Sequence, residues 1–381
     1  MLKTIEINNY KLFKEFRIDF SEGINLICGP NGSGKSALRE LLYALTDFLA
    51  MPDVSDHVAH SVSESFPTEV FCRWLPHETG SDDIDICMEI GDESSWFRYC
   101  LTIRYNFRDH KTRVQKESLE FIVQERKDII FSFSDGTIDV LTDDGRQLVF
   151  NTDWSMSGLV AASRNNSKIR RFGEMVSKLF AVKIEPEAIS QDFKGESRTL
   201  GVNGERFPGW HFYHTTNHSE KQSFLIEQCK NFIPGFVSVN SPLSGDFFRW
   251  KVRVKYLGRS FDLAFRELSD GQKTLFALYS LLTNVPEGAT VFIDEPENFL
   301  APGELQPWLD VLHDVWEERN IQWIMISHNP KTLNWHHKEA IIFSIEGEPP
   351  QIVVKKNNNN ASGSLYSKIS EMEWTGYVAE S

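Results

Sequence analysis

The chain has 381 residues, 41% hydrophobic and 25% charged, a composition that supports a substantial core and excludes global disorder. A net charge of −14 excludes a surface that is basic throughout, so any contact with nucleic acid must be local. The length exceeds that of a usual single domain and predicts one large domain with insertions, or two lobes.

The cysteines and the N-terminus indicate the compartment. The cysteine count is odd, no CxxC pair occurs, and most of the cysteines lie inside apolar runs, so we interpret them as buried free thiols of a reducing compartment: Cys28, Cys72, Cys87, Cys100 and Cys229. The N-terminal sequence lacks the apolar core of a signal peptide, and no apolar run is long enough to span a bilayer. These features predict a soluble, cytoplasmic protein without a membrane segment.

The first half of the chain predicts strands more than helices. Alternating apolar residues indicate two strands, a turn at 21–23 and a buried strand at 24–28, and apolar residues at helical spacing follow from 36 to 50. From about 68 to 152, short alternating stretches are separated by turns. This pattern predicts an antiparallel meander with one face exposed to solvent.

The second half returns to alternating helices and strands. A helical stretch covers 160–180, and a less regular segment covers 185–208. After a buried strand that ends in two acidic residues, the pattern predicts a helix at 304–319 and strands at 321–327 and 339–345. The sequence thus predicts an α/β core whose two halves are separated by a strand-rich arm and a helical lobe.

One segment carries a strong phosphate-binding pattern. Gly29 to Ser36 reads GPNGSGKS, which fits GxxxxGK[ST] between a buried strand and a helix. Backbone N–H groups would face a phosphate, Lys35 would reach the β- and γ-phosphates, and the Ser36 hydroxyl would ligate Mg²⁺. A glycine-rich turn without a ligand is the alternative, which the Lys-Ser pair disfavours. The residues expected to bind ATP are Gly29, Pro30, Asn31, Gly32, Ser33, Gly34, Lys35, Ser36 and Ala37.

Two further strand ends carry polar residues that suit phosphate chemistry. The strand VFI ends in Asp294, which would hold Mg²⁺, and Glu295, which would act as general base on the attacking water. The next strand ends before His328, which we interpret as a group that senses or positions the γ-phosphate. Solvated turns at both strand ends are the alternative. The predicted catalytic residues are Lys35, Glu295 and His328, and the predicted metal ligands are Ser36 and Asp294.

A second anion-friendly loop lies in the sequence LSDGQK, where Ser-Asp-Gly chemistry caps a helix N-terminus. The order of the four motifs resembles the ATP-binding-cassette (ABC) type of P-loop ATPase. The resemblance implies a split, mainly parallel core sheet with an antiparallel β arm and an inserted helical lobe. It also implies that Ser269, Gly271 and Gln272 cap ATP bound to the opposite subunit of a head-to-tail homodimer. Asp270 stands where transporters usually have a second glycine.

The sequence after the acidic pair narrows the resemblance. DEPENFLAP is similar to DEPExxLHP of RecF-, SMC- and OLD-like ATPases (an AAA_21-like group), with Ala301 in place of their usual histidine. Lys11 stands where an arginine is common, and Gln191 is a candidate for the glutamine that couples the Mg²⁺ site to the helical lobe. The resemblance covers about the first fifty residues and 261–345. The sequence contains no long heptad array, so we do not expect the coiled-coil arm of a true SMC protein. The segment after residue 345 is too short for an OLD nuclease domain.

The predicted organisation has five parts. They are an N-terminal half of the ATPase core at 1–60, an antiparallel β arm at 61–153, a helical or mixed inserted lobe at 154–260, a C-terminal half of the core at 261–356, and a flexible linker with a tail at 357–381.

Two weaker patterns are explained at least as well by ordinary packing or solvent exposure as by a binding site. The three histidines His211, His214 and His218 lie at helical spacing, which suits metal, but aromatic packing explains them better because no acid or thiol is adjacent. Two basic clusters are interpreted as solvated faces more readily than as nucleic-acid patches: Arg249, Lys251, Arg253 and Lys255, and Arg164, Lys168, Arg170 and Arg171.

The leading hypothesis is a Mg²⁺-dependent ATPase that dimerises on ATP and controls a separately encoded effector. The resemblance suggests a nuclease in DNA repair or anti-phage defence as that effector. One alternative is a RecF- or SMC-like clamp that acts directly on DNA. A transporter nucleotide-binding subunit is a further alternative, which the sequence ENFLAP disfavours.

Overall fold

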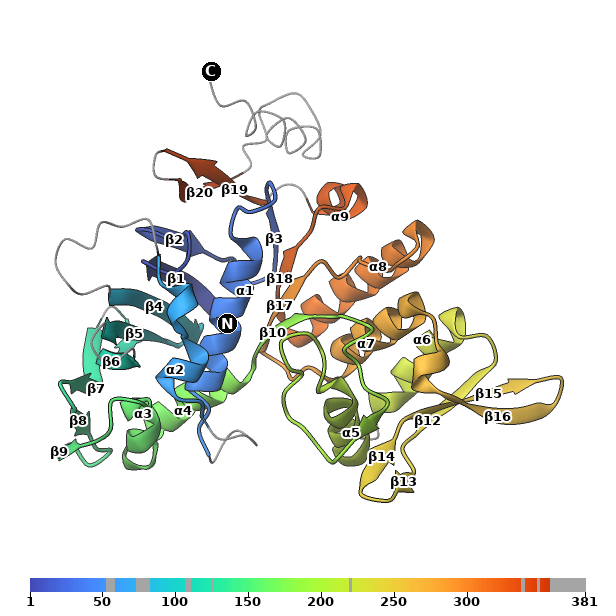
Figure 1. The fold of residues 1–381 in the computed structure, drawn as a ribbon, viewed down its shortest axis with the longest axis horizontal. Helices are drawn as coiled ribbons and strands as arrows, with labels where there is room; N and C mark the ends of the chain where they lie inside the picture. The colour runs from blue at the N-terminus through green and yellow to red at the C-terminus, as the bar shows by residue number, and fades with distance from the viewer. Residues whose placement is uncertain are drawn as a thin grey trace.

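The computed structural model describes residues 1–52, 59–72, 83–106, 111–124, 126–218, 221–336, 340–347 and 350–356, so the predicted linker and tail at 357–381 lie outside the described residues. Figure 1 shows a strand-rich lobe on one side of a central sheet and a helix-rich lobe on the other. Among the described residues, no helix is long and apolar enough to cross a membrane.

The central layer is a six-stranded sheet in the order β10-β17-β18-β3-β19-β20. Its first five strands are parallel, and β20 closes the edge antiparallel to β19. Every residue of β3, β17 and β18 is buried, as expected for strands covered on both faces. The strands are β10 (Leu179–Lys183), β17 (Thr290–Asp294), β18 (Gln322–Ile326), β3 (Ile24–Cys28), β19 (Ile341–Glu346) and β20 (Gln351–Lys356).

The β arm is an eight-stranded antiparallel sheet in which the two N-terminal strands pair with the meander. Its order is β2-β1-β4-β5-β6-β7-β8-β9. The strand β8 was not predicted, and the start of the predicted meander at 68–70 is instead a 3₁₀ turn, η1 (Thr68–Val70). The strands are β1 (Leu2–Asn8), β2 (Phe16–Asp19), β4 (Asp83–Asp92), β5 (Ser95–Asn106), β6 (Lys111–Val123), β7 (Arg126–Ser134), β8 (Thr137–Leu141) and β9 (Gln147–Asn151).

The helix α1 (Lys35–Phe48) packs where the two sheets meet (Figure 1). Apolar residues recur along it at three- and four-residue spacing, and Leu38, Leu41, Leu42 and Leu45 are all buried. They join one core cluster with side chains of the arm sheet and of the central sheet, such as Tyr99 and Phe292. Shorter helices complete this lobe: α2 (Val62–Ser65), α3 (Gly158–Ala162) and α4 (Ser167–Ser177), with the 3₁₀ turn η2 (Ser163–Asn165).

A second core cluster covers the other face of the central sheet. It contains the fully buried rings of Trp210, Trp250, Phe276 and Trp308, which come from the inserted lobe and from the two long C-terminal helices. The helices are α5 (Phe207–Asn217), α6 (Gln222–Phe232), α7 (Asp270–Asn284), α8 (Pro302–Arg319) and α9 (Pro330–Trp335). Two small sheets accompany them: β11 (Asp192–Phe193) with β13 (Leu243–Ser244) and β14 (Phe247–Arg249), and β12 (Phe236–Asn240) with β15 (Lys251–Tyr256) and β16 (Arg259–Ala264).

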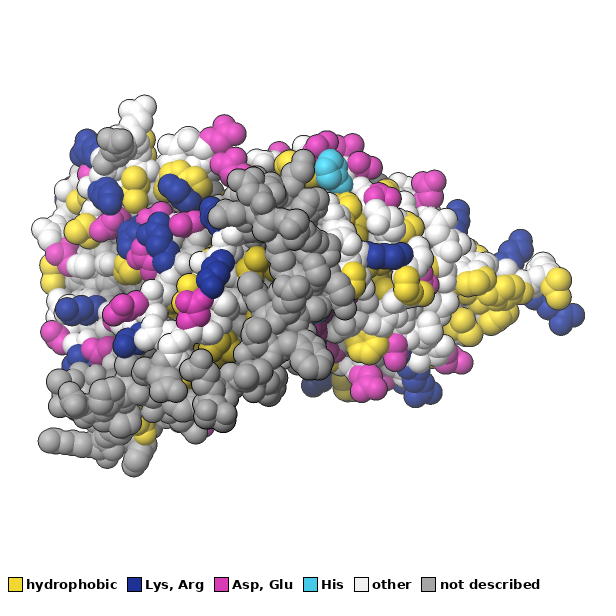
Figure 2. All heavy atoms as spheres, turned by 90° about the horizontal axis from the view of Figure 1, so that it is seen from above, with side chains coloured by type: hydrophobic (Ala, Val, Ile, Leu, Met, Phe, Trp, Pro, Cys, Tyr) yellow, Lys and Arg dark blue, Asp and Glu magenta, His cyan; other side chains and the backbone are white. Residues whose placement is uncertain are grey.

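The histidine pattern and the basic residues of β14 and β15 lie in this lobe, whereas the basic cluster from Arg164 to Arg171 lies on η2 and α4 of the other lobe. The His211 ring lies 5.2 Å from the rings of Trp250 and Phe276, and burial lowers its pKa to about 3. The basic side chains of β15 face solvent opposite buried Val252 and Val254. The β15–β16 hairpin projects from the body of the molecule (Figure 2).

The prediction of five free thiols was wrong for one pair. Cys87 on β4 and Cys100 on β5 lie directly opposite each other in the antiparallel register, with their Cα atoms 4.2 Å apart, and the structure joins them in a disulfide. Pattern reading alone could not show this pairing, because it depends on the register of two strands. Cys28, Cys72 and Cys229 are free and buried, as predicted.

Candidate active site

The phosphate loop connects β3 to α1, and its glycines are required by close approach. Gly29 has a φ of +147°, and a Cβ there would lie 2.3 Å from the carbonyl oxygen of Phe343 on β19. Gly34 has a φ of +82°, and a Cβ there would lie 2.2 Å from Cδ1 of Ile352 on β20. The loop therefore lies against the β19–β20 edge of the sheet, where a side chain would displace its backbone.

The Lys35 side chain is folded back over the loop. Its ammonium group donates to the carbonyl oxygens of Gly29 and Pro30, both at 2.8 Å, and lies 3.4 Å from the hydroxyl of Ser33. The side chain is only 6% exposed, so its charge is held among loop carbonyls rather than in water. This position places the cation in the concave face of the loop, where β- and γ-phosphates would bind.

The exposed Ser36 and the buried Arg39 and Asp294 connect the loop to the end of β17. The Asp294 carboxylate accepts a hydrogen bond from the Ser36 hydroxyl, and its Oδ2 lies 3.4 Å from Nε of Arg39. Arg39 also donates through Nη1 to the carbonyl oxygen of Val202, at 2.7 Å. Burial raises the pKa of Asp294, and the hydrogen bond from Ser36 and the charge of Arg39 oppose that shift.

The same groups fit a divalent cation. Oδ1 of Asp294 is buried and has no hydrogen-bond partner, although it belongs to a carboxylate that is only 2% exposed. An unsatisfied carboxylate oxygen beside a serine hydroxyl is the ligand chemistry that Mg²⁺ takes at P-loop sites. Ser36 and Asp294 are therefore the residues that would hold Mg²⁺, which would neutralise charge developing on the phosphate oxygens.

Glu295 follows Asp294 in the chain, but its carboxylate makes contacts with other residues than that of Asp294 does. Its φ of +48° turns the backbone sharply after β17, and its N–H donates to the carbonyl of Ile326 on β18 at 2.9 Å. Oε2 accepts from Nδ2 of Asn298 at 2.9 Å and lies 3.9 Å from Nζ of Lys183, at the end of β10. Two side chains thus orient a half-exposed carboxylate at the rim of the phosphate loop.

His328 follows β18 in a segment anchored by a buried acid. The carboxylate of Glu297 accepts from the hydroxyl of Ser327 and, at 3.2 Å, from the backbone N–H of Asn329. Burial raises the pKa of Glu297, and these hydrogen bonds oppose the shift. These two bonds anchor the residues before and after His328, and so hold its backbone beside the loop after β17.

One cavity of about 290 Å³ brings these elements together. The structure places most of the predicted site residues in its wall, together with Lys11, which the resemblance had indicated, and two that the sequence did not suggest, Leu12 and Ile326. The predicted residues are Asn31, Gly32, Ser33, Gly34, Lys35, Ser36, Ala37, Asp294, Glu295 and His328. Gly29 and Pro30 approach through their carbonyl oxygens, which bind Lys35.

Sequence reasoning missed Arg39, Lys183 and Asn298, which contact the two acidic residues from three different elements. Arg39 offered the only local signal, because it lies one helical turn after Ser36 on the same helix. The contact of Lys183 depends on β10 lying beside β17, and β10 itself was not predicted.

The LSDGQK loop begins α7 and is separate from this cavity. Ser269 is the N-cap: its hydroxyl accepts from the N–H of Gln272 at 3.2 Å, and its own N–H donates to Oε1 of Gln272 at 3.0 Å. A Cβ on Gly271 would lie 2.9 Å from the carbonyl oxygen of Phe299, in the turn after Glu295. Among the described residues that line the cavity, none belongs to Ser269–Gln272.

Gln191 lies between β10 and the inserted lobe. Its backbone carbonyl accepts from the N–H of Trp250 at 2.7 Å, and its side-chain Oε1 is buried without a hydrogen-bond partner. It is not among the described residues that line the ATP cavity. It follows the core strand β10, which ends at Lys183, and immediately precedes β11, and a role as the coupling glutamine stays a prediction.

The chain is similar to known proteins over different lengths. Residues 24–334 match the family AAA_21, described as "AAA domain, putative AbiEii toxin, Type IV TA system". Over 43 residues, 11% of the chain, it is 46% identical to the DNA double-strand break repair Rad50 ATPase of Nanoarchaeum equitans, and this match spans 6% of that relative.

Solved SMC heads share the fold. The SMC head bound to the C-winged helix domain of ScpA superimposes with a TM-score of 0.51 at 14% identity, over 93% of this chain and 98% of that chain. The SMC head domain of Thermotoga maritima is 15% identical, with a TM-score of 0.43 over 93% and 99% of the two chains. The predicted α/β fold class is confirmed. The chain belongs to the AAA_21 family, and its fold is shared with the solved SMC head.

Proposed function

We propose that this protein binds and hydrolyses ATP with Mg²⁺ as a head-to-tail homodimer, and that the ATP state controls a separate effector. The observation that carries the proposal is the contact between the P-loop and the end of β17. Ser36 hydrogen-bonds to the buried carboxylate of Asp294, and Oδ1 of that carboxylate has no hydrogen-bond partner within the chain. A P-loop without a ligand would not need an unsatisfied buried acid at this place.

The proposed reaction transfers the γ-phosphoryl group of ATP to water. Lys35 binds the β- and γ-phosphates, and the Glu295 carboxylate takes a proton from the attacking water as its oxygen bonds to phosphorus. The bond to the β-γ bridging oxygen breaks, and ADP and phosphate leave. Asn298 and Lys183 hold Glu295 in place, and His328 contacts the γ-phosphate from β18.

The proposal that the protein forms a homodimer rests on the LSDGQK loop, which we call the signature loop. Ser269 is exposed at the N-terminus of a fifteen-residue helix, where N–H groups and the helix dipole favour an anion. Phe299, in the turn that contacts Gly271, is 54% exposed. A face that carries an anion-binding helix end and an exposed ring beside the ATP cavity suits a second copy of the chain.

Glu295→Gln tests the mechanism. The amide cannot accept the proton, so turnover should fall at least ~100-fold while ATP still binds, and ATP-bound dimer should accumulate. ATP turnover and mass in solution are measured for wild type, Glu295→Gln and a control, Glu318→Gln, on the exposed side of α8. A Glu295→Gln protein that hydrolyses at the wild-type rate, or that stays monomeric with ATP, contradicts the proposal.

We propose that the effector is a nuclease of DNA repair or anti-phage defence. Two similarities support an ATPase that acts with other molecules: the Rad50 relative is named for DNA repair, and the SMC head is bound to a domain of ScpA. Co-expression with the product of an adjacent gene tests it. Nuclease activity that responds to ATP and to Glu295→Gln is expected.

A clamp that acts directly on DNA is less favoured. Two of the four basic side chains that suggested it are paired with acids: Nε of Arg249 lies 3.0 Å from Oδ1 of Asp192, and Nε of Arg253 lies 2.8 Å from Oδ1 of Asp262. Phosphate contacts would have to displace these acids. Strong, salt-sensitive duplex binding that Arg253→Glu/Lys255→Glu abolishes would reverse this ranking.

A further inference from the structure

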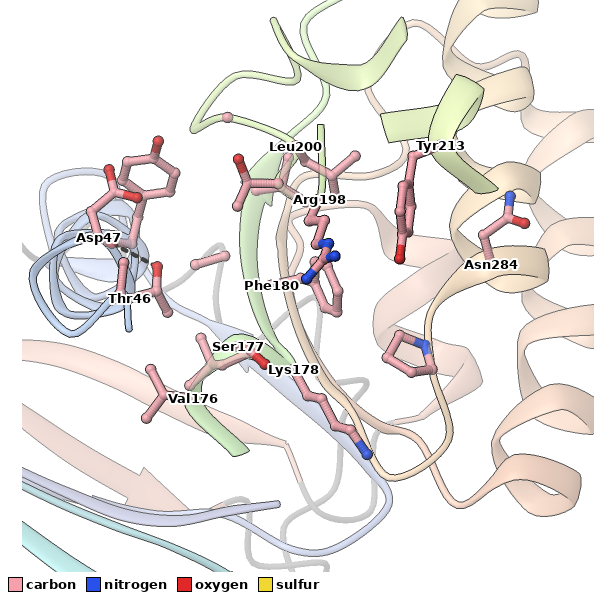
Figure 3. Close-up of a pocket in the computed structure, with 18 of the residues that line it drawn as sticks. Thr46, Asp47, Val176, Ser177, Lys178, Phe180, Arg198, Leu200, Tyr213 and Asn284 are labelled. Carbon is pink, nitrogen blue, oxygen red and sulfur yellow. Dashed lines mark hydrogen bonds between the residues drawn. The ribbon is translucent and has the colours of Figure 1, made fainter. Parts of the chain in front are cut away.

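A second cavity, of about 400 Å³, lies at the β10 edge of the central sheet, away from the phosphate loop. Its walls come from the end of α1, from α4 and β10, from residues 198–201, and from the two helices α5 and α7 (Figure 3). The volume falls in the range of small-molecule sites, which is about 300–1,000 Å³. The proposed ATPase mechanism makes no use of this cavity.

Much of the wall is apolar. Met51, Val176 and Leu179 are buried core residues that also line the cavity, and the half-buried ring of Phe180 lines it as well. Figure 3 shows Val176 on the same side of β10 as Thr46 and Asp47 of α1, and Phe180 beside Arg198 on the other side of the strand. Such a wall takes an apolar body, because burial there removes its surface from water.

The charged groups of the cavity favour an anion. Lys178, Arg198 and Lys221 line it, against Asp47 and Glu287. The Asp47 carboxylate is already engaged, because Oδ2 lies 3.5 Å from Nδ1 of His60 and the carboxylate accepts from the hydroxyl of Tyr43. The exposed Arg198 guanidinium lies 5.5 Å from the centre of the Tyr213 ring, at one side of the cavity (Figure 3).

A buried polar atom in the wall is unsatisfied. His214 on α5 is 9% exposed, and its Nδ1 has no hydrogen-bond partner. Burial lowers the pKa of His214 to about 4, so the ring is neutral at pH 7 and can donate one hydrogen bond. Buried polar atoms without partners are rare in folded proteins, and this one lines a cavity that can hold a ligand.

Two wall segments continue directly into the ATP site. Residues 198–201 are followed by Val202, whose carbonyl accepts from Arg39 at 2.7 Å, and Arg39 lies 3.4 Å from Asp294. The strand β10 lines the cavity up to Val182, and the next residue, Lys183, lies 3.9 Å from Glu295. The first wall segment is thus linked to Asp294 through two contacts and the second to Glu295 through one, so a change in either could reach a carboxylate of the proposed ATP site.

We propose that this cavity binds a small amphipathic anion, a flat apolar body with one carboxylate, sulfonate or phosphate group, and that its occupancy changes ATP affinity. Arg198 and Lys178 meet the anionic group, and His214 supplies a hydrogen bond. The binding half stands by itself, and the regulatory half rests on the proposed ATP site.

Binding is tested with 1-anilinonaphthalene-8-sulfonate, an aromatic anion, and its uncharged analogue N-phenyl-1-naphthylamine. Ser177→Trp and Thr46→Trp fill the cavity from two walls at partly or fully exposed positions, and Arg198→Glu reverses a charge. Saturable one-to-one fluorescence binding of both probes should be lost in either tryptophan variant. Arg198→Glu should weaken the sulfonate about tenfold and the neutral probe less than twofold.

Arg170→Glu is the matched control, because it makes the same charge change at an exposed position of α4 outside the cavity. It should leave both probes unchanged. Sulfonate binding that survives both tryptophan variants, or that Arg170→Glu weakens as much as Arg198→Glu, overturns the site.

Regulation is tested by ATP binding rather than turnover. Equilibrium dialysis with labelled ATP, with and without saturating sulfonate, should show an affinity change of at least about fivefold, and ATP should change sulfonate affinity by the same factor. Arg39→Lys should reduce this factor without changing sulfonate affinity in the absence of ATP. ATP that binds with the same affinity in both conditions overturns regulation, whereas ATP that does not bind at all removes the proposed ATPase and leaves the probe-binding result standing.

Discussion

The buried acid Glu117 in the β arm makes a prediction that the structure allows to be worked out. It is 1% exposed and accepts four hydrogen bonds, from the hydroxyls of Tyr99 (2.9 Å) and Ser157 (2.6 Å) and from the N–H groups of Gly158 (2.8 Å) and Leu159 (3.3 Å). These bonds tie β6 to the N-terminus of α3. Complete burial opposes them and prevails, and the pKa of Glu117 rises to about 6.

The sign and size follow from linkage. The folded pKa is raised above the unfolded value, so this carboxyl contributes stability that is complete below pH ~4.5 and is lost as the pH rises through ~6. A shift from 4.5 to about 6 corresponds to about 2 kcal/mol, of which about 1 kcal/mol falls between pH 5 and 7.5. The free energy of unfolding of the wild type should decrease by that amount in this window because of Glu117.

Urea unfolding of wild type and Glu117→Gln across this window isolates the contribution, because the amide does not titrate. The stability advantage of the wild type over the variant should shrink by about 1 kcal/mol as the pH rises from 5 to 7.5. Glu120→Gln, on the same strand at a half-buried position, is the matched control. An advantage that stays constant or grows with pH would refute the reasoning and show that the four donors outweigh burial.

Three further changes test the ATP site. In Gly34→Ala the new Cβ would clash with Ile352, and the backbone there is left-handed. This variant should lower the free energy of unfolding by about 2–4 kcal/mol and weaken ATP binding in calorimetry. Gly32→Ala has the same backbone strain but open space around its Cβ, so it should lower the free energy of unfolding by only about 1–2 kcal/mol. Arg39→Leu should destabilise the protein by about 3 kcal/mol in urea because buried Asp294 loses its cation, and adding Asp294→Asn should recover part of the loss. Ser269→Arg should leave ATP affinity of the monomer unchanged in calorimetry and abolish ATP-dependent dimer mass and turnover; a variant that still dimerises would contradict the assignment of the signature loop.

The sequence was sufficient where local pattern decides the structure. The strand–glycine loop–helix order around Lys35 and the buried strand before Asp294 each predict their own element, and parallel pairing brings their ends to one edge. One helix separates the acidic strand from the strand before His328, and these two strands, β17 and β18, pair in parallel, so that Glu295 and His328 line one cavity.

The sequence was insufficient where contacts join distant segments. Arg39 meets the carbonyl of Val202, 163 residues away, and no periodicity records that pairing. The strand β10 was missed because LFAVK continues the apolar pattern of the preceding helix, and its place at the sheet edge is a tertiary property. Missing β10 also hid Lys183 and the second cavity, since both depend on that strand.

The turn after β17 ties hydrolysis to the dimer face. Glu295 begins this turn with a left-handed backbone, and Phe299 ends it with another, at a φ of +70°. The Phe299 carbonyl lies so close to Gly271 that any Cβ there would displace it. A movement of Glu295 would therefore reach the first turn of α7 through residues 295–299, two of which have a left-handed backbone, without passing through the core. The proposed general base and the loop proposed to cap a partner's ATP are thus connected by one turn within one subunit, so under the proposed mechanism hydrolysis in one site would loosen the cap on the other.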